Sequence, residues 1–252
     1  MSHLNPPGFG AGPKPATKLT AAINAAVYDL LDFSDRQEFD FATRGWIEPA
    51  EDLEIRGADG EVIWSVKTFE FVWRPAPPSA NPSLWRDTQL NRYAGFFEVT
   101  PGIYQVRGFD MANVSFIKSD HGWIIFDPLI CIENMQAAKA LAEKHLGRLR
   151  VVAVIYSHPH IDHFGGVAGL ISRQDVADPS LSLDEQLASG KIPVLAPAGF
   201  TEHAVSENVY AGDAMARRAM YQYGTLIGKG PKDALCIGIG LGQSVEIGRA
   251  HV

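Results

Sequence analysis

The sequence lacks a long hydrophobic run. No stretch of about 18 apolar, uncharged residues occurs in its 252 positions, and this predicts that no helix spans a membrane. The opening residues, MSHLNPPG, also lack a basic segment followed by an apolar core. The chain as given is therefore predicted to carry no secretory signal. We expect a cytoplasmic protein, or a periplasmic or secreted one if the N-terminus is incomplete.

Cysteine and positive charge are both scarce. Cys131 and Cys236 are too few for a disulfide framework and are expected to be small buried side chains, although they can in principle pair. The 22 Lys and Arg residues are outnumbered by 29 Asp and Glu, so the net charge is −7. This balance argues against nucleic acid as a partner and against nuclease action, because phosphate contacts need clustered cations. The hydrophobic share of 46% is typical of a globular chain.

Hydrophobic periodicity predicts a mixed α/β (α+β) fold. Helices are expected over 17–31, 133–146 and 213–223, and strands over 62–66, 68–73, 97–99, 103–107, 114–118, 123–126, 151–156 and 192–195. The strand over 68–73 is expected to pair with 62–66 as a hairpin, and 178–190 to form a surface loop with a short helix. Hairpins followed by helix, buried strand and helix predict a mixed sheet with helical cover.

A proline-rich stretch suggests a division of the chain. Pro75, Pro77, Pro78 and Pro82 predict a linker. We therefore expect an N-terminal extension of helix plus hairpin over 1–75 and a second region over 76–246.

The motif that carries chemistry follows the predicted buried strand 151–156. Residues 157–166 read SHPHIDHFGG, in which His158, His160, Asp162 and His163 are potential metal ligands. In an extended segment residues i and i+2 face the same side, so the first two histidines can converge on one cation. After a turn the other two can face a second, and two metals about 3.5–4 Å apart can share a bridging hydroxide. Gly165 and Gly166 permit close backbone packing.

Other interpretations of this motif stay open at this point. The segment can be a polar turn whose histidines only form hydrogen bonds, or it can hold one catalytic or structural metal ion.

The motif resembles the HxHxDH signature of the metallo-β-lactamase superfamily. The resemblance implies an αββα sandwich and a metal-dependent hydrolase. Asp127, which with Pro128 ends the strand 123–126, resembles that superfamily's strand-end aspartate. It is expected to support the ligands from outside the metal coordination sphere.

Further segments resemble one branch, the zinc-dependent alkyl sulfatases that hydrolyse dodecyl sulfate and related esters. These segments are 35–45, 200–212 (FTEHAVSENVYAG), 214–224 and 240–243 (GLGQ). The resemblance implies hydrolysis of alkyl sulfates to alcohol and sulfate by a zinc-bound water, with two Zn²⁺ ions per intact chain. His158 and His160 would hold the first ion, and Asp162 and His163 the second.

The resemblance also suggests roles for residues outside the motif. Asn208 and Tyr210 are candidate donors to the sulfate, because amide and phenol groups suit its oxygens. His203 is expected to be structural, and at least one of Arg217 and Arg218 to face solvent. Other catalytic residues are unknown from the sequence.

The chain departs from the family pattern at its end. The family's two further glutamates and one further histidine should fall after residue 252, so we expect an N-terminal fragment, a sandwich incomplete at the C-terminus, weak metal binding and no sulfatase activity. The last residues, IGRAHV over 247–252, are what a common sequencing-adapter string would encode, so they are predicted to be a non-native tail and His251 to have no role. A homodimer is expected when the protein is full length.

Two alternative functions remain. One is another hydrolase of this fold, acting on a thioester, lactone or β-lactam. The other is a non-catalytic metal-binding fragment.

Overall fold

The structure is a computed structural model, and it describes residues 14–223 and 227–235. The predicted glycine-rich segment 240–243, Cys236 and the predicted tail 247–252 lie outside the described residues.

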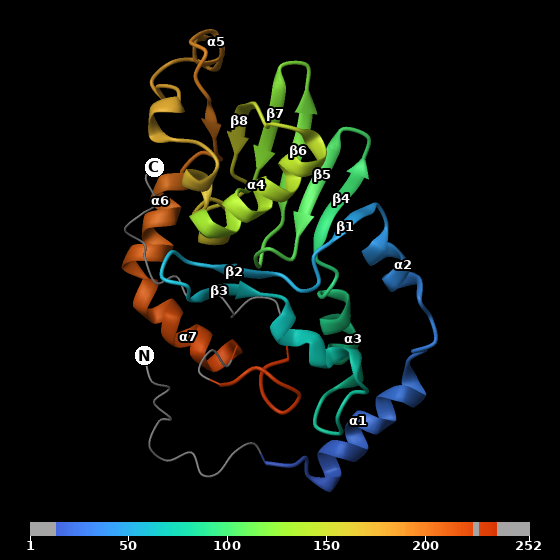
Figure 1. The fold of residues 1–252 in the computed structure, drawn as a ribbon. Helices are drawn as coiled ribbons and strands as arrows, with labels where there is room; N and C mark the ends of the chain where they lie inside the picture. The colour runs from blue at the N-terminus through green and yellow to red at the C-terminus, as the bar shows by residue number, and fades with distance from the viewer. Residues whose placement is uncertain (1–13, 224–226, 236–252) are drawn as a thin grey trace.

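A seven-stranded mixed sheet forms the centre of the fold (Figure 1), in the order β1-β4-β5-β6-β7-β8-β9. Its strands are β1 Trp46–Pro49, β4 Gly95–Thr100, β5 Ile103–Arg107, β6 Val114–Ser119, β7 Gly122–Phe126, β8 Val151–Ile155 and β9 Val194–Leu195. Neighbours from β1 to β7 are antiparallel, whereas β7, β8 and β9 run parallel. The predicted mixed α/β fold is confirmed.

Helix α4, Ile132–Leu146, connects the parallel strands β7 and β8 and lies across one face of the sheet (Figure 1). Its Met135 and Ala138 are fully buried in one cluster with Phe116 and Ile125 of the sheet. Gly147 ends the helix at φ 73°, a conformation that glycine adopts without strain. The sequence predicted both this helix and its cap.

The N-terminal region contributes three helices and a small two-stranded sheet. These elements are α1 Lys18–Leu30, α2 Gln37–Thr43, α3 Pro82–Leu90, β2 Glu54–Arg56 and β3 Val62–Ser65. The side chain of Thr17 caps the predicted first helix by accepting from the backbone N–H of Thr20 at 3.1 Å.

The predicted strand 68–73 is wrong, because Lys67–Trp73 forms two short 3₁₀-helical turns that meet at a kink at Phe69. Its two buried side chains, Phe69 and Val72, are three residues apart. That spacing matches the three residues per turn of a 3₁₀-helix rather than the alternation of a strand. The predicted hairpin partner β3 pairs instead with β2.

The predicted proline linker is shorter than expected. Pro82 begins α3, and the side chain of Asn81 caps this helix by accepting from the N–H of Ser83 at 2.8 Å. Trp64 and Phe116 share one hydrophobic cluster. The core therefore continues across the predicted boundary at 75–76.

The last described part of the chain is mostly helical. It comprises α5 Leu183–Ala188, α6 Phe200–Val205, the π-helical turn Ser206–Tyr210 and α7 Gly212–Tyr223. The predicted helices near 178–190 and 213–223 are confirmed, whereas the predicted strand 192–195 is reduced to β9. In the described part of the chain, no helix is both long and apolar enough to cross a membrane.

Candidate metal centre

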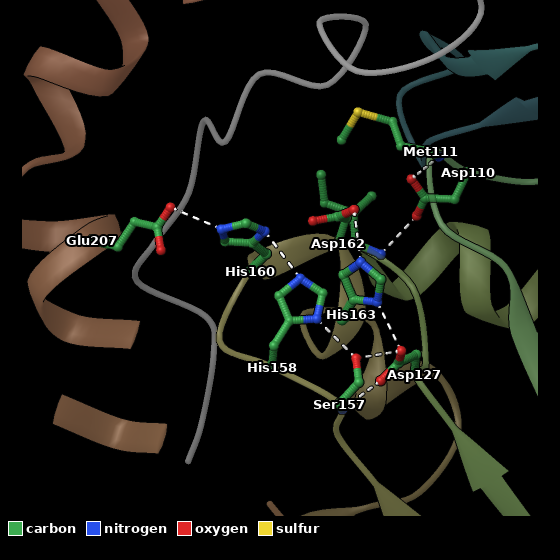
Figure 2. A network of polar contacts seen from close by, with 10 residues as sticks. Asp110, Met111, Asp127, Ser157, His158, His160, Asp162, His163 and Glu207 are labelled. Carbon is green, nitrogen blue, oxygen red and sulfur yellow. Dashed lines mark hydrogen bonds and ion pairs between the residues drawn. The ribbon is translucent and has the colours of Figure 1, made fainter. Parts of the chain in front are cut away.

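The predicted metal loop lies at the carboxyl edge of the parallel strands, where α/β sheets commonly bind ligands. It follows β8 directly, and Asp127 follows the neighbouring strand β7. The backbone N–H of Asp127 donates to the carbonyl of Ile155 at 3.0 Å, so the two strand ends are held side by side. Figure 2 shows the side chains of this edge pointing toward one another.

His158 and His160 face each other, although the backbone bends at 157–159 and is not extended there as the i, i+2 argument expected. The Nε2 atom of His158 lies 3.0 Å from the Nδ1 atom of His160. The other ring nitrogen of His158, Nδ1, lies 2.8 Å from the hydroxyl of Ser157. When Nδ1–H donates to this hydroxyl, the lone pair of Nε2 is directed toward His160.

Asp162 and His163 form the second pair, on the short 3₁₀-helix Ile161–His163. The Oδ2 atom of Asp162 lies 3.3 Å from the Nε2 atom of His163. The Nδ1 atom of His163 lies 2.8 Å from the Oδ2 atom of Asp127. The latter contact orients the ring and leaves Nε2 directed at Asp162, as a carboxylate does behind a metal-bound histidine.

One donor pair has the spacing of two ligands on a transition-metal ion, and the other pair is slightly closer. For bonds of about 2.0–2.2 Å in tetrahedral geometry, two ligand atoms lie roughly 3.3–3.5 Å apart. The separations here are 3.0 Å for the histidine pair and 3.3 Å for the Asp162 and His163 pair. Within residues 14–223 and 227–235 no three His, Cys, Asp or Glu side chains are grouped to hold one ion. Each pair by itself offers two donors, fewer than the three or four protein ligands usual for zinc.

Charges at the second pair shift its pKa values strongly. Burial lowers the pKa of His163, but the hydrogen bonds to Asp127 and Asp162 outweigh burial and raise it to about 9. Burial raises the pKa of each aspartate, but the contacts with His163 hold both below the usual value. Without a metal, His163 is therefore a cation between two carboxylates near neutral pH. A metal ion would replace this charge.

Burial and neighbouring positive charge lower the pKa of His158. Burial is the larger cause, followed by the fields of His163 and His160. His158 is thus biased toward the neutral ring that metal binding requires.

Asp127 reaches its partners through an unusual backbone. Asp127 and Leu129 have φ values of 57° and 63°, on either side of Pro128. Asp127 is 5% exposed, and its carboxylate accepts from the N–H of Ser157 at 2.8 Å and from its hydroxyl at 2.6 Å. Left-handed backbone costs free energy for residues other than glycine, and such strain is concentrated at functional sites. The structure thus places Asp127 where the sequence predicted a supporting role, which stays a prediction.

Glycines after the loop allow it to pack against this strained turn. A Cβ atom on Gly166 would lie 2.2 Å from the carbonyl oxygen of Pro128, and one on Gly165 would lie 2.2 Å from that of Ile130. Only glycine permits these approaches. The close packing that the sequence predicted at these two positions is present.

Asp110 is a supporting residue that sequence reasoning missed. It is 4% exposed, and its carboxylate accepts from the backbone N–H groups of Met111 and Ile130 at 2.6 Å each. Burial raises its pKa to about 7. It therefore holds the turn that carries Asp127. No sequence motif marks Asp110. Its role is visible only in the folded chain, where the N–H of Ile130 lies against its carboxylate.

The structure brings Asn208 to the metal loop but leaves Tyr210 in solvent. The amide nitrogen of Asn208 donates to the carbonyls of Pro159 at 3.3 Å and Ala204 at 2.8 Å. A sulfate-binding role for Asn208 stays a prediction, and it would require exchange of these bonds. Tyr210 is 86% exposed. Its predicted sulfate-binding role also stays a prediction.

The remaining predicted residues lie on the surface. His203 on α6 and Arg217 and Arg218 on α7 are exposed. Cys131 is half-buried at the start of α4, and burial raises the pKa of its thiol to about 11.

A comparison with known protein families matches the part of the chain that contains this site. The family described as "Metallo-beta-lactamase superfamily" matches residues 107–225, which include the metal loop and Asp127. Residues 107–225 are therefore similar to that superfamily, whose members are generally metal-dependent.

Most of the chain is more specifically similar to alkylsulfatases. A linear primary-alkylsulfatase from Pseudomonas sp. is 45% identical over 237 residues, which cover 93% of this chain and 33% of the relative. An (R)-specific secondary-alkylsulfatase from Pseudomonas sp. is 46% identical over 218 residues, covering 86% of this chain and 31% of the relative. The solved structure of the stereoselective inverting sec-alkylsulfatase Pisa1 from Pseudomonas sp. matches with a TM-score of 0.78 and 46% identity, over 87% of this chain and 33% of that one. The predicted resemblance is confirmed, and the chain spans about a third of the length of these relatives.

Proposed function

We propose that this protein hydrolyses alkyl sulfate esters to an alcohol and sulfate, using two zinc ions. The observation that carries the proposal is the pair of two-donor sets on one loop, His158 with His160 and Asp162 with His163. They occur in a chain 45% identical to a linear primary-alkylsulfatase. Imidazole and carboxylate are both good zinc ligands, and two adjacent ions suit attack of water on an ester.

The residues of this chain would hold and orient the centre. Ser157 keeps the proton of His158 on Nδ1, and Asp127 keeps that of His163 on Nδ1, so that both Nε2 atoms face the centre. His163 gives up its second proton when the centre forms. When bound, the metal pair would supply Lewis-acid activation of water and of the sulfate oxygens.

The bond that breaks is a separate part of the proposal. One relative is named as an inverting enzyme, and inversion at carbon requires that water attack the ester carbon. We therefore expect C–O cleavage. Hydrolysis in heavy-oxygen water would put the label in the alcohol, whereas label in the sulfate would show S–O cleavage.

The central test compares metal content and turnover. We expect the product of the reading frame at the genomic locus to bind zinc and to release dodecanol from dodecyl sulfate, and H158A and D162A variants to lose both properties. The matched control is H121A, because His121 is exposed in the turn between β6 and β7. Because each pair on this loop would supply two donors to its ion, the loss of one donor should weaken zinc binding steeply.

Two results would end this proposal. One is a zinc-free product, and the other is full turnover after removal of metal by a chelator. Turnover of a thioester, lactone or β-lactam in place of both primary and secondary alkyl sulfates would assign another reaction of the superfamily. Light scattering of the same product tests the expected homodimer, and a monomer would contradict it.

A further inference from the structure

A glutamate outside the metal loop contacts the ligand His160. The Oε1 atom of Glu207 lies 3.0 Å from the Nε2 atom of His160, on the side of the ring opposite the Nδ1 atom that faces His158 (Figure 2). The side chain of His160 is 54% exposed, so packing alone does not fix the orientation of its ring. Its two polar contacts are therefore what orient it.

The segment that carries Glu207 is docked onto the same loop by a second contact. Asn208, the next residue, donates to the carbonyl of Pro159 at 3.3 Å, next to His160. Both residues belong to the π-helical turn Ser206–Tyr210, which the bond from the N–H of Ala211 to the carbonyl of Ser206 closes at 3.0 Å. Single π-helical turns inside helices are frequent at functional sites.

The three histidines of the loop then follow one pattern. In each ring one nitrogen faces the other donors of the centre, and the other nitrogen has an oxygen partner. The partner is Ser157 for His158, Asp127 for His163 and Glu207 for His160. A partner of this kind decides which nitrogen carries the proton and which binds metal.

We propose that Glu207 is a positioning residue that holds the Nε2–H of His160 and so presents its Nδ1 atom to the first metal ion, together with the Nε2 atom of His158. This inference rests on the proposed metal-binding function of the loop. It assigns to the segment 206–210 a role in building the centre, in addition to the sulfate-binding role predicted for Asn208 and Tyr210.

The competing explanation is an ordinary surface ion pair, since the side chain of Glu207 is 35% exposed. Such a pair contributes little to stability and would not change metal binding. The two explanations differ in metal affinity and in the nitrogen that binds.

The test uses the 252-residue chain with Zn²⁺ alone, titrated against a competing chelator. We expect E207A to weaken zinc binding about 10–100-fold, the usual effect of removing such a partner. E207Q keeps an acceptor oxygen and should weaken binding less than E207A. The matched control is E202A, because Glu202 is exposed on the preceding helix α6, and it should bind as the wild type does.

Nitrogen NMR of the zinc-loaded wild type gives a second readout that needs no variant. It should show metal on Nδ1 and a proton on Nε2 of His160. Metal on Nε2, or equal zinc affinity of E207A and E202A in chains with native circular dichroism, would overturn the inference and leave the proposed function standing. A 252-residue wild-type chain that binds no zinc would overturn the inference alone, whereas a zinc-free product of the genomic reading frame would overturn the proposed function as well.

Discussion

Replacing Asp127 with asparagine tests how the centre is held together before metal binds. Asparagine has the shape of aspartate and tolerates the left-handed backbone at φ 57°. The change therefore removes the charge without adding backbone strain. It also leaves one acceptor oxygen where the carboxylate accepts from Ser157 twice and contacts His163 once.

The expected magnitude follows from the pKa of His163. A rise from the ordinary value of about 6.5 to about 9 corresponds to roughly 3 kcal/mol at full strength. The hydrogen bond to Asp127 stands first among the causes that raise this pKa, so about half of the rise should be lost with its charge. An unmatched hydrogen-bonding group in a buried position costs about 1–3 kcal/mol in addition. We expect D127N to lose roughly 3–4 kcal/mol of unfolding free energy near pH 6.5.

The pH dependence has a definite sign. Because the pKa of His163 is higher in the folded chain than in the unfolded one, its stabilisation is fully present below about pH 6.5 and is lost as the pH rises through about 9. The wild type should lose about 3 kcal/mol across this window, and D127N should lose less.

The assay is urea unfolding of the 252-residue chain in excess chelator, at intervals from pH 6 to pH 9.5. The control is D120N, because Asp120 is exposed in the turn between β6 and β7. A wild-type unfolding free energy that is flat or rising between pH 6.5 and 9 would refute the reasoning. A D127N chain as stable as D120N would refute it as well.

Three further predictions concern the same region and the core. Zinc binding at the Asp162 and His163 pair should release about one proton at pH 8 and progressively less above pH 9, because His163 is protonated in the metal-free chain. Calorimetry in buffers of different ionisation enthalpy measures the number of protons released. Equal release at pH 8 and pH 10 would contradict the prediction. Gly166→Ala should lower the unfolding free energy by about 3 kcal/mol or more, because its Cβ would lie 2.2 Å from one backbone carbonyl oxygen and 2.6 Å from another. Gly60→Ala has open space around it and should lower it by only about 1–2 kcal/mol, for its positive φ. Equal falls in unfolding free energy, measured with urea, would count against the close packing at Gly166. Phe116→Ala, at a fully buried position of the sheet, should cost about 3–5 kcal/mol, and a smaller fall in unfolding free energy than for the exposed Phe41→Ala would contradict the placement of the core.

Local patterns in the sequence were sufficient for the elements around the site. The helix before β8 follows from apolar spacing and from Gly147, both of which act within a few residues. The tight packing of Gly166 follows from its missing side chain. Such features depend on residues that are close together in the sequence, so they can be predicted from the sequence alone.

The same reasoning failed where the apolar residues of a segment fit both the alternation of a strand and the spacing of a helix. Residues 68–73 alternate in hydrophobicity as a strand does, but the chain buries Phe69 and Val72 in 3₁₀-helical turns. The surrounding core decides which side chains are buried, and the alternation of the segment does not contain that information.

The sequence by itself determined the four candidate ligands, their order and the strand that presents them. Only the tertiary structure decided which of their rings Asp127 and Glu207 contact, because both residues come from segments far from the loop in the chain. Parallel pairing of β7 with β8 brings Asp127 to His163, and the docking of 206–210 brings Glu207 to His160. These contacts join residues far apart in the chain, so they depend on the path of the backbone and leave no local pattern in the sequence.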